Sequence, residues 1–272
     1  GLQWLGTPGH MITTASGKID SWIHPDYRTA TYDDDNNPAT AEAPWPEVDK
    51  RYATAIRRID DAVGDIQRLL QDLNIDRDTL VVFSSDNGPS IESGLNKKPL
   101  RADFFNSFGP FDGIKRDCLE GGMRVPTLVR WPGHIPAGEI VTPPSIAYDW
   151  LRTFADVAGV PAPARADGVS LLPELTGQGV HQDSGYIYVE YFHNGKTPNY
   201  QEFATEHRGL HRGQMQAIRM GDYIGLRYNI KSPDEPFSIY NVTKDPKETN
   251  NLASKMHSME EQMQSKTLQA RR

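Results

Sequence analysis

Apolar positions recur at helical spacing in the segment that follows Pro46. The stripe steps by four and three residues, and it comprises Tyr52, Ile56, Ile59, Val63, Ile66, Leu70 and Leu73. This spacing predicts a helix with one face packed on a core. Pro46 and Glu47 suit its first turn, because proline is tolerated there and the helix dipole favours an acidic residue. Asn74 marks its end.

A short, uniformly apolar run follows this helix. Residues Leu80 to Phe83 contain no polar side chain, and two of them are β-branched, which is typical of a strand buried on both faces. A helix followed by such a strand is half of a βαβ unit. The pattern therefore predicts an α/β fold.

The rest of the chain contains one more helix–strand region and then a run of strands. Arg124 to Trp131 is predicted to be a strand, and Tyr148 to Ala158 a helix that ends at Gly159. The alternation of apolar and polar residues predicts later strands at Tyr186–Phe192, Gln214–Met220, Tyr223–Tyr228 and Phe237–Val242. A polar helix is expected from Met256 onward. The polar stretch Thr176 to Ser184 places a domain boundary near residue 180.

Bulk composition excludes several classes of protein. With 272 residues the chain is long enough for one α/β domain and a small appended layer. A net charge of −7 and the lack of a basic stripe argue against a nucleic-acid binder. No stretch of 18 apolar residues exists, so no membrane span is expected. Cys118 is the single cysteine, which excludes an intrachain disulfide.

The first 48 residues are rich in Gly, Pro, Asp and Asn. The acidic run Asp33 to Asn37 is interpreted as a solvated loop. The sequence starts at Gly1 without an initiator methionine, and we expect it to be an N-terminally truncated piece.

Candidate chemistry lies where the strand at Leu80 ends, in Asp86-Asn87-Gly88. In open α/β sheets, ligands bind just beyond the carboxyl ends of the strands. Asp86 and Asn87 would place two hard oxygen ligands there, which suit Ca²⁺ or Mg²⁺. The structural alternative is an Asx turn that closes the strand.

A second segment, Gly113-Ile-Lys-Arg-Asp-Cys-Leu-Glu-Gly-Gly-Met-Arg-Val-Pro126, is followed by Trp131-Pro-Gly133. Together with the first motif it resembles the sulfatase family of the alkaline-phosphatase superfamily. In that family a strand ending in Ser-Asp-Asn-Gly is followed by a lysine, then by Glu-Gly-Gly-x-Arg-Val-Pro. Lys115 lies five residues before Glu120, the spacing of that family. The segment from Ile239 to Ala253 resembles the end of the family's C-terminal subdomain.

The resemblance implies a mixed, mostly parallel sheet flanked by helices, as an incomplete alkaline-phosphatase-like core, with a small C-terminal α+β subdomain. Residues 1–180 would be the second half of the catalytic domain, and residues 181–272 the subdomain. By the same resemblance, Asp86 and Asn87 are metal ligands for Ca²⁺ or Mg²⁺. Lys115 is then a catalytic cation that contacts a sulfate oxygen or the leaving-group oxygen.

The family's nucleophile is a formylglycine made from the first residue of Cys/Ser-x-Pro-x-Arg. No such segment occurs in the chain, and Cys118 is not in that context. The resemblance therefore implies that formylglycine belongs to a missing N-terminal segment and that this chain alone is inactive. Thr7-Pro-Gly-His10 partly matches a Pro-His setting of the family, whereas His24 is interpreted as structural.

Residues near the second motif are assigned supporting roles. Glu120 and Arg124 are expected to brace the glycine turn, and Arg116, Asp117 and Cys118 are interpreted as structural. The polar insertion Asn194 to Arg212 is interpreted as a surface loop, with specificity for an anionic glycan or aryl sulfate as the alternative.

The predicted function is hydrolysis of sulfate esters, with a sulfated small molecule or sulfated glycan as the partner. Two alternatives remain open: a phosphodiesterase or phosphonate hydrolase of the same superfamily, and a non-catalytic glycan-binding or structural relative. The family resemblance places the intact protein in the periplasm, outside the cell or in the lysosome.

Overall fold

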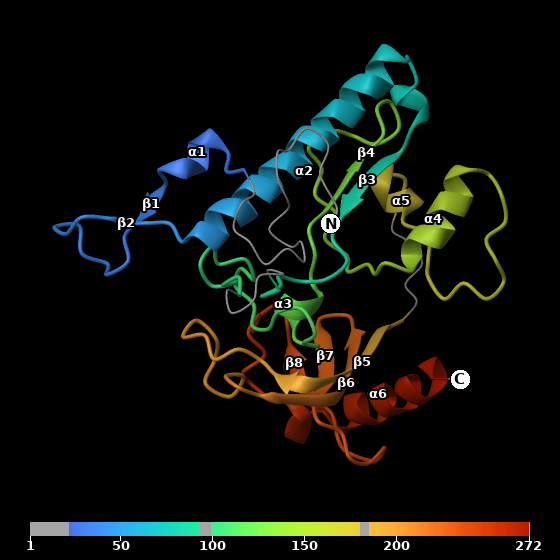
Figure 1. Ribbon diagram of the computed structural model, residues 1–272. Helices are drawn as coiled ribbons and strands as arrows, with labels where there is room; N and C mark the ends of the chain where they lie inside the picture. The colour runs from blue at the N-terminus through green and yellow to red at the C-terminus, as the bar shows by residue number, and fades with distance from the viewer. Residues whose placement is uncertain (1–21, 93–98, 180–184, 272) are drawn as a thin grey trace. The chain divides into compact units, whose positions relative to one another are not determined.

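The computed structural model describes residues 22–92, 99–179 and 185–271 (Figure 1). The chain divides into two compact units. The first contains residues 1–75 and 89–107, and the second contains residues 76–88 and 108–272. No helix in the described ranges is long and apolar enough to cross a membrane.

The first unit is built around the long helix α2 (Glu47–Asp72). The short helix α1 (Pro25–Arg28) precedes it, together with the antiparallel pair β1 (Thr31–Tyr32) and β2 (Ala43–Pro44). Pro46 occupies the N-cap position of α2. The bounds of the predicted helix are therefore confirmed almost to the residue.

The expected burial of the apolar stripe of α2 is met only in part, since Ile59 and Val63 are half-buried whereas other members are exposed. Ile56 and Ile66 are 48% and 52% exposed. The buried residues of the helix all lie between Asp49 and Thr54. Among the described residues, the buried apolar cluster at this helix lies near its start, where Val48 and Tyr52 pack on Leu100.

The second unit begins with the 3-10 turn η1 (Asp76–Asp78) and strand β3 (Val81–Ser84). Strand β3 pairs antiparallel with β4 (Thr127–Arg130). Val81 to Phe83 are half-buried, and Leu128 on the partner strand is 65% exposed, so the prediction that this strand is buried on both faces is wrong. Every strand pairing found in the described ranges is antiparallel, and the parallel sheet stays a prediction.

Three short helices follow in the chain: α3 (Glu120–Met123), α4 (Asp149–Val157) and α5 (Leu172–Leu175). The helix expected at Tyr148–Ala158 corresponds to α4. The fold mixes helices and strands, as predicted. The domain boundary expected near residue 180 falls on residues 180–184, which lie outside the described ranges.

The C-terminal part forms a four-stranded antiparallel sheet in chain order, where the sequence predicts a run of strands. Its strands are β5 (Ile187–Lys196), β6 (His211–Met220), β7 (Tyr223–Arg227) and β8 (Ser238–Asn241). The 3-10 turn η2 (Ala253–Lys255) and helix α6 (His257–Ala270) follow. The predicted C-terminal helix is confirmed.

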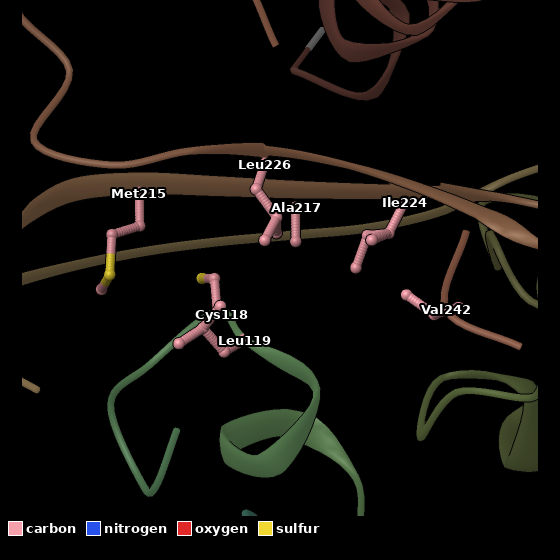
Figure 2. Packing of buried hydrophobic residues seen from close by; sticks show 7 residues of the cluster. All are labelled: Cys118, Leu119, Met215, Ala217, Ile224, Leu226 and Val242. Atoms are coloured by element: carbon pink, nitrogen blue, oxygen red, sulfur yellow. The ribbon is translucent and has the colours of Figure 1, made fainter. Parts of the chain in front are cut away.

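The two faces of this sheet carry different partners. On one face Met263 of α6 packs with Ile218, Phe237 and Ile239. On the other face Cys118 and Leu119 point toward the strands and meet Met215, Ala217, Ile224, Leu226 and Val242 (Figure 2). Because side chains alternate along a strand, neighbouring residues of β6 serve opposite faces. The sheet therefore packs on the segment just before α3 with one face and on α6 with the other.

Candidate functional site

The turn Asp86-Asn87-Gly88 directly follows strand β3 and its neighbour Ser85. Asp86 is exposed and Asn87 is half-buried. The side-chain nitrogen Nδ2 of Asn87 donates to the carbonyl oxygen of Gly88 at 2.9 Å, and the Ser85 hydroxyl donates to the carbonyl oxygen of Asn87 at 3.1 Å. The turn therefore has a defined backbone shape, with the Asp86 carboxylate on its exposed side.

A second turn, Glu120-Gly121-Gly122 at the start of helix α3, lies directly against the first. The backbone N–H of Gly88 donates to the carbonyl oxygen of Gly122 at 2.9 Å. A Cβ atom on Gly88 would overlap the carbonyl oxygen of Gly121. The structure thus brings together the two motifs that carry Asp86 and Lys115, through a contact that only glycine permits at residue 88.

The second turn also closes the loop that carries Lys115. The backbone N–H of Gly121 donates to the carbonyl oxygen of Asp112 at 2.8 Å. A Cβ atom on Gly121 would lie 2.5 Å from that same oxygen, and one on Gly122 would lie 2.5 Å from the carbonyl oxygen of Ile114. Residues 112–122, called the lysine loop below, therefore form a closed ring of backbone contacts with Lys115 on it.

Three buried acidic residues hold the lysine loop, and the first is Asp112. Its carboxylate oxygen Oδ2 lies 2.8 Å from Nδ1 of His207 and accepts a hydrogen bond from the backbone N–H of Ala204, also at 2.8 Å. The ammonium of Lys247 lies 3.7 Å from the other oxygen. All three partners belong to the C-terminal part of the chain.

The second buried acid is Asp117. The guanidinium of Arg212 donates from Nε to Oδ1 at 2.7 Å and from Nη2 to Oδ2 at 2.8 Å. The Thr197 hydroxyl donates to Oδ1 at 2.6 Å, and the backbone N–H of Ile114 donates to Oδ2 at 3.0 Å. Each oxygen of the Asp117 carboxylate therefore accepts two hydrogen bonds.

The third buried acid is Glu120, which pairs with Arg124 and lies 3.4 Å from Arg219. Its backbone N–H donates to Oε2 of Glu248 at 3.2 Å. Burial, and then the nearby Glu120 carboxylate, raise the pKa of Glu248 well above its usual range. Glu248 is thus favoured in its protonated form, which limits repulsion between the two acids.

Arg124 and the segment Asn194–Arg212 both contact the lysine loop. Arg124 pairs with Glu120, the first residue of the glycine turn, which agrees with the expectation that both residues brace that turn. The interpretation of Asn194–Arg212 as a surface loop is wrong, because Phe203, His207 and Arg212 within it are buried. A polar composition does not by itself predict exposure, because polar residues can be buried when each has a charged or hydrogen-bonding partner.

Cys118 has the environment of a structural residue. It is buried against the sheet, and its backbone N–H donates to the Tyr228 hydroxyl at 2.8 Å. Burial, followed by the charge of Asp117, raises the pKa of the Cys118 thiol to about 12. A thiol that stays protonated at neutral pH is a poor nucleophile.

A complete metal site is not found in the described ranges. No group of three or more His, Cys, Asp or Glu side chains that could hold a metal ion occurs there. Asp86 and Asn87 offer two hard oxygen atoms, which fit Ca²⁺ or Mg²⁺ in kind. His10 lies outside the described residues. His24 has a structural role, since its Nδ1 accepts from the backbone N–H of Asp26 in α1 at 3.2 Å.

Two family models match the chain. The model described as Sulfatase matches residues 20–160, and the model described as N-sulphoglucosamine sulphohydrolase, C-terminal, matches residues 107–272. Human N-acetylgalactosamine-6-sulfatase is 37% identical over 169 residues, which are 61% of this chain and 31% of that protein. Human steryl-sulfatase is 35% identical over 139 residues, 50% of this chain and 23% of that protein. The chain thus spans about a quarter to a third of the length of these relatives.

Solved structures share the fold. The crystal structure of Ps i-CgsB in complex with k-i-k-neocarrahexaose is 27% identical with a TM-score of 0.59, covering 80% of this chain and 42% of that one. Phosphonate monoester hydrolase of Agrobacterium radiobacter is 23% identical with a TM-score of 0.55, covering 83% of this chain and 41% of that one. The second likeness bears on the fold alone.

Proposed function

The chain belongs to the sulfatase family, and we propose that it supplies the lysine and part of the metal site with which a sulfuric ester hydrolase holds the sulfate group. The observation that carries this proposal is the hydrogen bond between Gly88 and Gly122, which joins the turn of Asp86 and Asn87 to the lysine loop. The oxygen atoms of Asp86 and Asn87 and the ammonium of Lys115 are thereby carried by two segments in backbone contact.

Cleavage of a sulfate ester concentrates negative charge on the sulfate and leaving-group oxygens. Catalysis of such a step is mainly electrostatic and depends on charges fixed in place beforehand. The ammonium of Lys115 is a compact charge that would bind one of these oxygens. Asp86 and Asn87 would hold a divalent cation, which polarises a bound anion when present.

The nucleophile is proposed to come from another part of the protein. Sulfatases use formylglycine, and the chain contains no Cys/Ser-x-Pro-x-Arg segment from which to make it. A lysine and two metal ligands can bind an anion, but they cannot form the covalent intermediate that divides the reaction into two easier steps. We therefore expect no hydrolysis of an aryl sulfate by these 272 residues alone.

The proposed substrate is a sulfated glycan or a small sulfated molecule. Two observations support this class: the relatives include an N-acetylgalactosamine-6-sulfatase, and the solved structure of Ps i-CgsB contains a neocarrahexaose. A lysosomal or exported location of the whole protein is part of the same proposal.

Phosphonate hydrolysis is the second candidate, because a phosphonate monoester hydrolase shares the fold.

The test is carried out on the full-length protein that contains this chain, with an aryl sulfate and an aryl phosphonate monoester as substrates. We expect the sulfate to be preferred. Lys115→Ala should lower kcat/KM for the sulfate by about 10²- to 10³-fold, the loss typical of one charge-stabilising donor. Asp86→Ala should abolish hydrolysis. The control is Lys255→Ala, which removes an exposed lysine of η2 and should leave activity unchanged.

Two results would count against the proposal. Preference for the phosphonate would favour the second candidate. A Lys115→Ala variant within about twofold of the parent, beside an inactive Asp86→Ala variant, would remove the lysine assignment and keep the metal assignment.

A further inference from the structure

Lys115 is separated by one residue from Asp117, whose carboxylate accepts a hydrogen bond from each of Ile114 and Thr197 and two from Arg212. Asp117 and Arg212 are both buried, and two parallel hydrogen bonds of 2.7 and 2.8 Å join them. Such a forked pair fixes the plane and the direction of both groups, which a single ion pair does not. Asp117 is therefore held in one orientation relative to strand β6.

The same carboxylate also holds the backbone next to Lys115. The oxygen Oδ2 of Asp117 accepts the backbone N–H of Ile114, the residue that immediately precedes the lysine, at 3.0 Å. The Lys115 backbone is thus enclosed between Asp117 and the residue that Asp117 binds. Movement of the carboxylate would move the starting point of the lysine side chain.

Attachment of the loop to the sheet does not require this pair. Cys118 and Leu119 pack on Met215 and Ala217 of β6, and they bury the loop independently of any charge (Figure 2). The forked pair adds orientation to a segment that apolar contacts already hold in place. Arg212→Lys would keep the positive charge but lose the two parallel hydrogen bonds to Asp117.

We infer that Asp117 and Arg212 are positioning residues for Lys115, which they hold at the place where it meets the anionic group. This inference rests on the proposed role of Lys115. Small displacements of a charge-stabilising group cost much activity, up to about 10²-fold for a shift of about 1 Å. Because the pair acts only through Lys115, its substitution should affect activity only when Lys115 is present.

The experiment is a double-mutant cycle in the full-length protein with an aryl sulfate as substrate. Arg212→Lys should lower kcat by about tenfold or more, with a smaller change in KM. In the Lys115→Ala background the same substitution should change kcat by less than about twofold, because the group it positions is already gone.

The control is Arg227→Lys on the neighbouring strand β7. Arg227 is also buried, but its guanidinium stacks on Phe237 at 3.8 Å and donates to the carbonyl oxygen of Pro233 at 3.2 Å. Any effect of this substitution should be the same in the parent and in the Lys115→Ala background. Circular dichroism and melting temperature verify that each variant is folded.

Thr197→Val provides a milder perturbation if Arg212→Lys does not fold. It removes only the hydroxyl that donates to Asp117 at 2.6 Å. We expect a fall in kcat of a few fold that is present with Lys115 and absent without it. Equal losses in both backgrounds, or full activity of these variants beside a strongly impaired Lys115→Ala variant, would overturn the inference. A Lys115→Ala variant with normal activity would instead overturn the lysine assignment itself, and the inference with it.

Discussion

Gly88 and Gly122 approach so closely that their backbones form a hydrogen bond of 2.9 Å, with no space for a side chain on Gly88. The contact unites two turns that lie far apart in the sequence. Because the obstacle to a larger residue is the backbone of Gly121 rather than a flexible side chain, the turns would have to separate to admit even a methyl group.

Gly88→Ala is therefore expected to destabilise the chain by roughly 1–3 kcal/mol, the usual cost of forcing atoms into a packed site. For a protein of this size each kcal/mol corresponds to about 2–4 °C in melting temperature. Gly64→Ala in α2 is the matched control, since its nearest neighbour is the flexible guanidinium of Arg68 at 3.4 Å. That change should stabilise the helix by about 0.5–1 kcal/mol. Equal melting curves for parent and Gly88→Ala would show that the turns are not in tight contact.

Asp49 gives the stability of the first unit a defined pH dependence. It is fully buried in the first turn of α2, and neither carboxylate oxygen has a hydrogen-bond partner among the described residues. Burial, partly offset by the charge of Arg101, raises the pKa of Asp49 to about 6 from the ordinary value of 3.8. The folded state then keeps a proton that the unfolded state releases between these two pH values.

The sign follows from that difference: this contribution is fully present below about pH 4 and is lost as the pH rises through about 6. Asp49→Asn should remove the loss, so its melting temperature should exceed that of the parent at pH 7 and vary less between pH 4 and 7. Asp65→Asn, at an exposed position of the same helix, should leave the pH dependence of the parent unchanged. Parallel curves for parent and Asp49→Asn would contradict the assignment.

Removal of calcium should have little effect on the isolated chain. Ca²⁺ takes about six to eight oxygen ligands, and Asp86 and Asn87 supply two. Melting temperatures measured with CaCl₂ and with EDTA should therefore differ by less than about 2 °C. A tight site, saturated at about 1,000 times its Kd, would instead add about 4 kcal/mol. A rise of that size, lost in Asp86→Ala, would show that the 272 residues contain a complete calcium cage.

Local patterns in the sequence predict the elements well. The bounds of α2 follow from its apolar period and from Pro46, and the strands of the C-terminal sheet follow from alternation. The burial of a side chain is harder to predict from the sequence, because it depends on which other segment covers that face of the element. Ile56 and Ile66 share the period of a buried stripe and are nevertheless exposed in the described structure.

In the candidate site, too, some residues can be identified from the sequence and others only from the folded structure. Asp86, Asn87 and Lys115 are identified by motifs, and their roles remain predictions. The groups that hold the lysine loop carry no local signal, since Asp112 and His207 are 95 residues apart, as are Asp117 and Arg212. Any of many acids and bases could pair over such a separation, and only the folded chain selects the partners.

The distance along the chain between the lysine loop and its anchors also sets an order of events during biosynthesis. Glu120 is made 128 residues before Glu248. At about 5–20 residues per second, ribosomes need roughly 6 to 26 seconds to add that length. Until the residues of the C-terminal part have been made, Asp112, Asp117 and Glu120 lack the partners that will bury them. We therefore expect the nascent protein to order Lys115 only after strands β5 to β8 have been translated and folded.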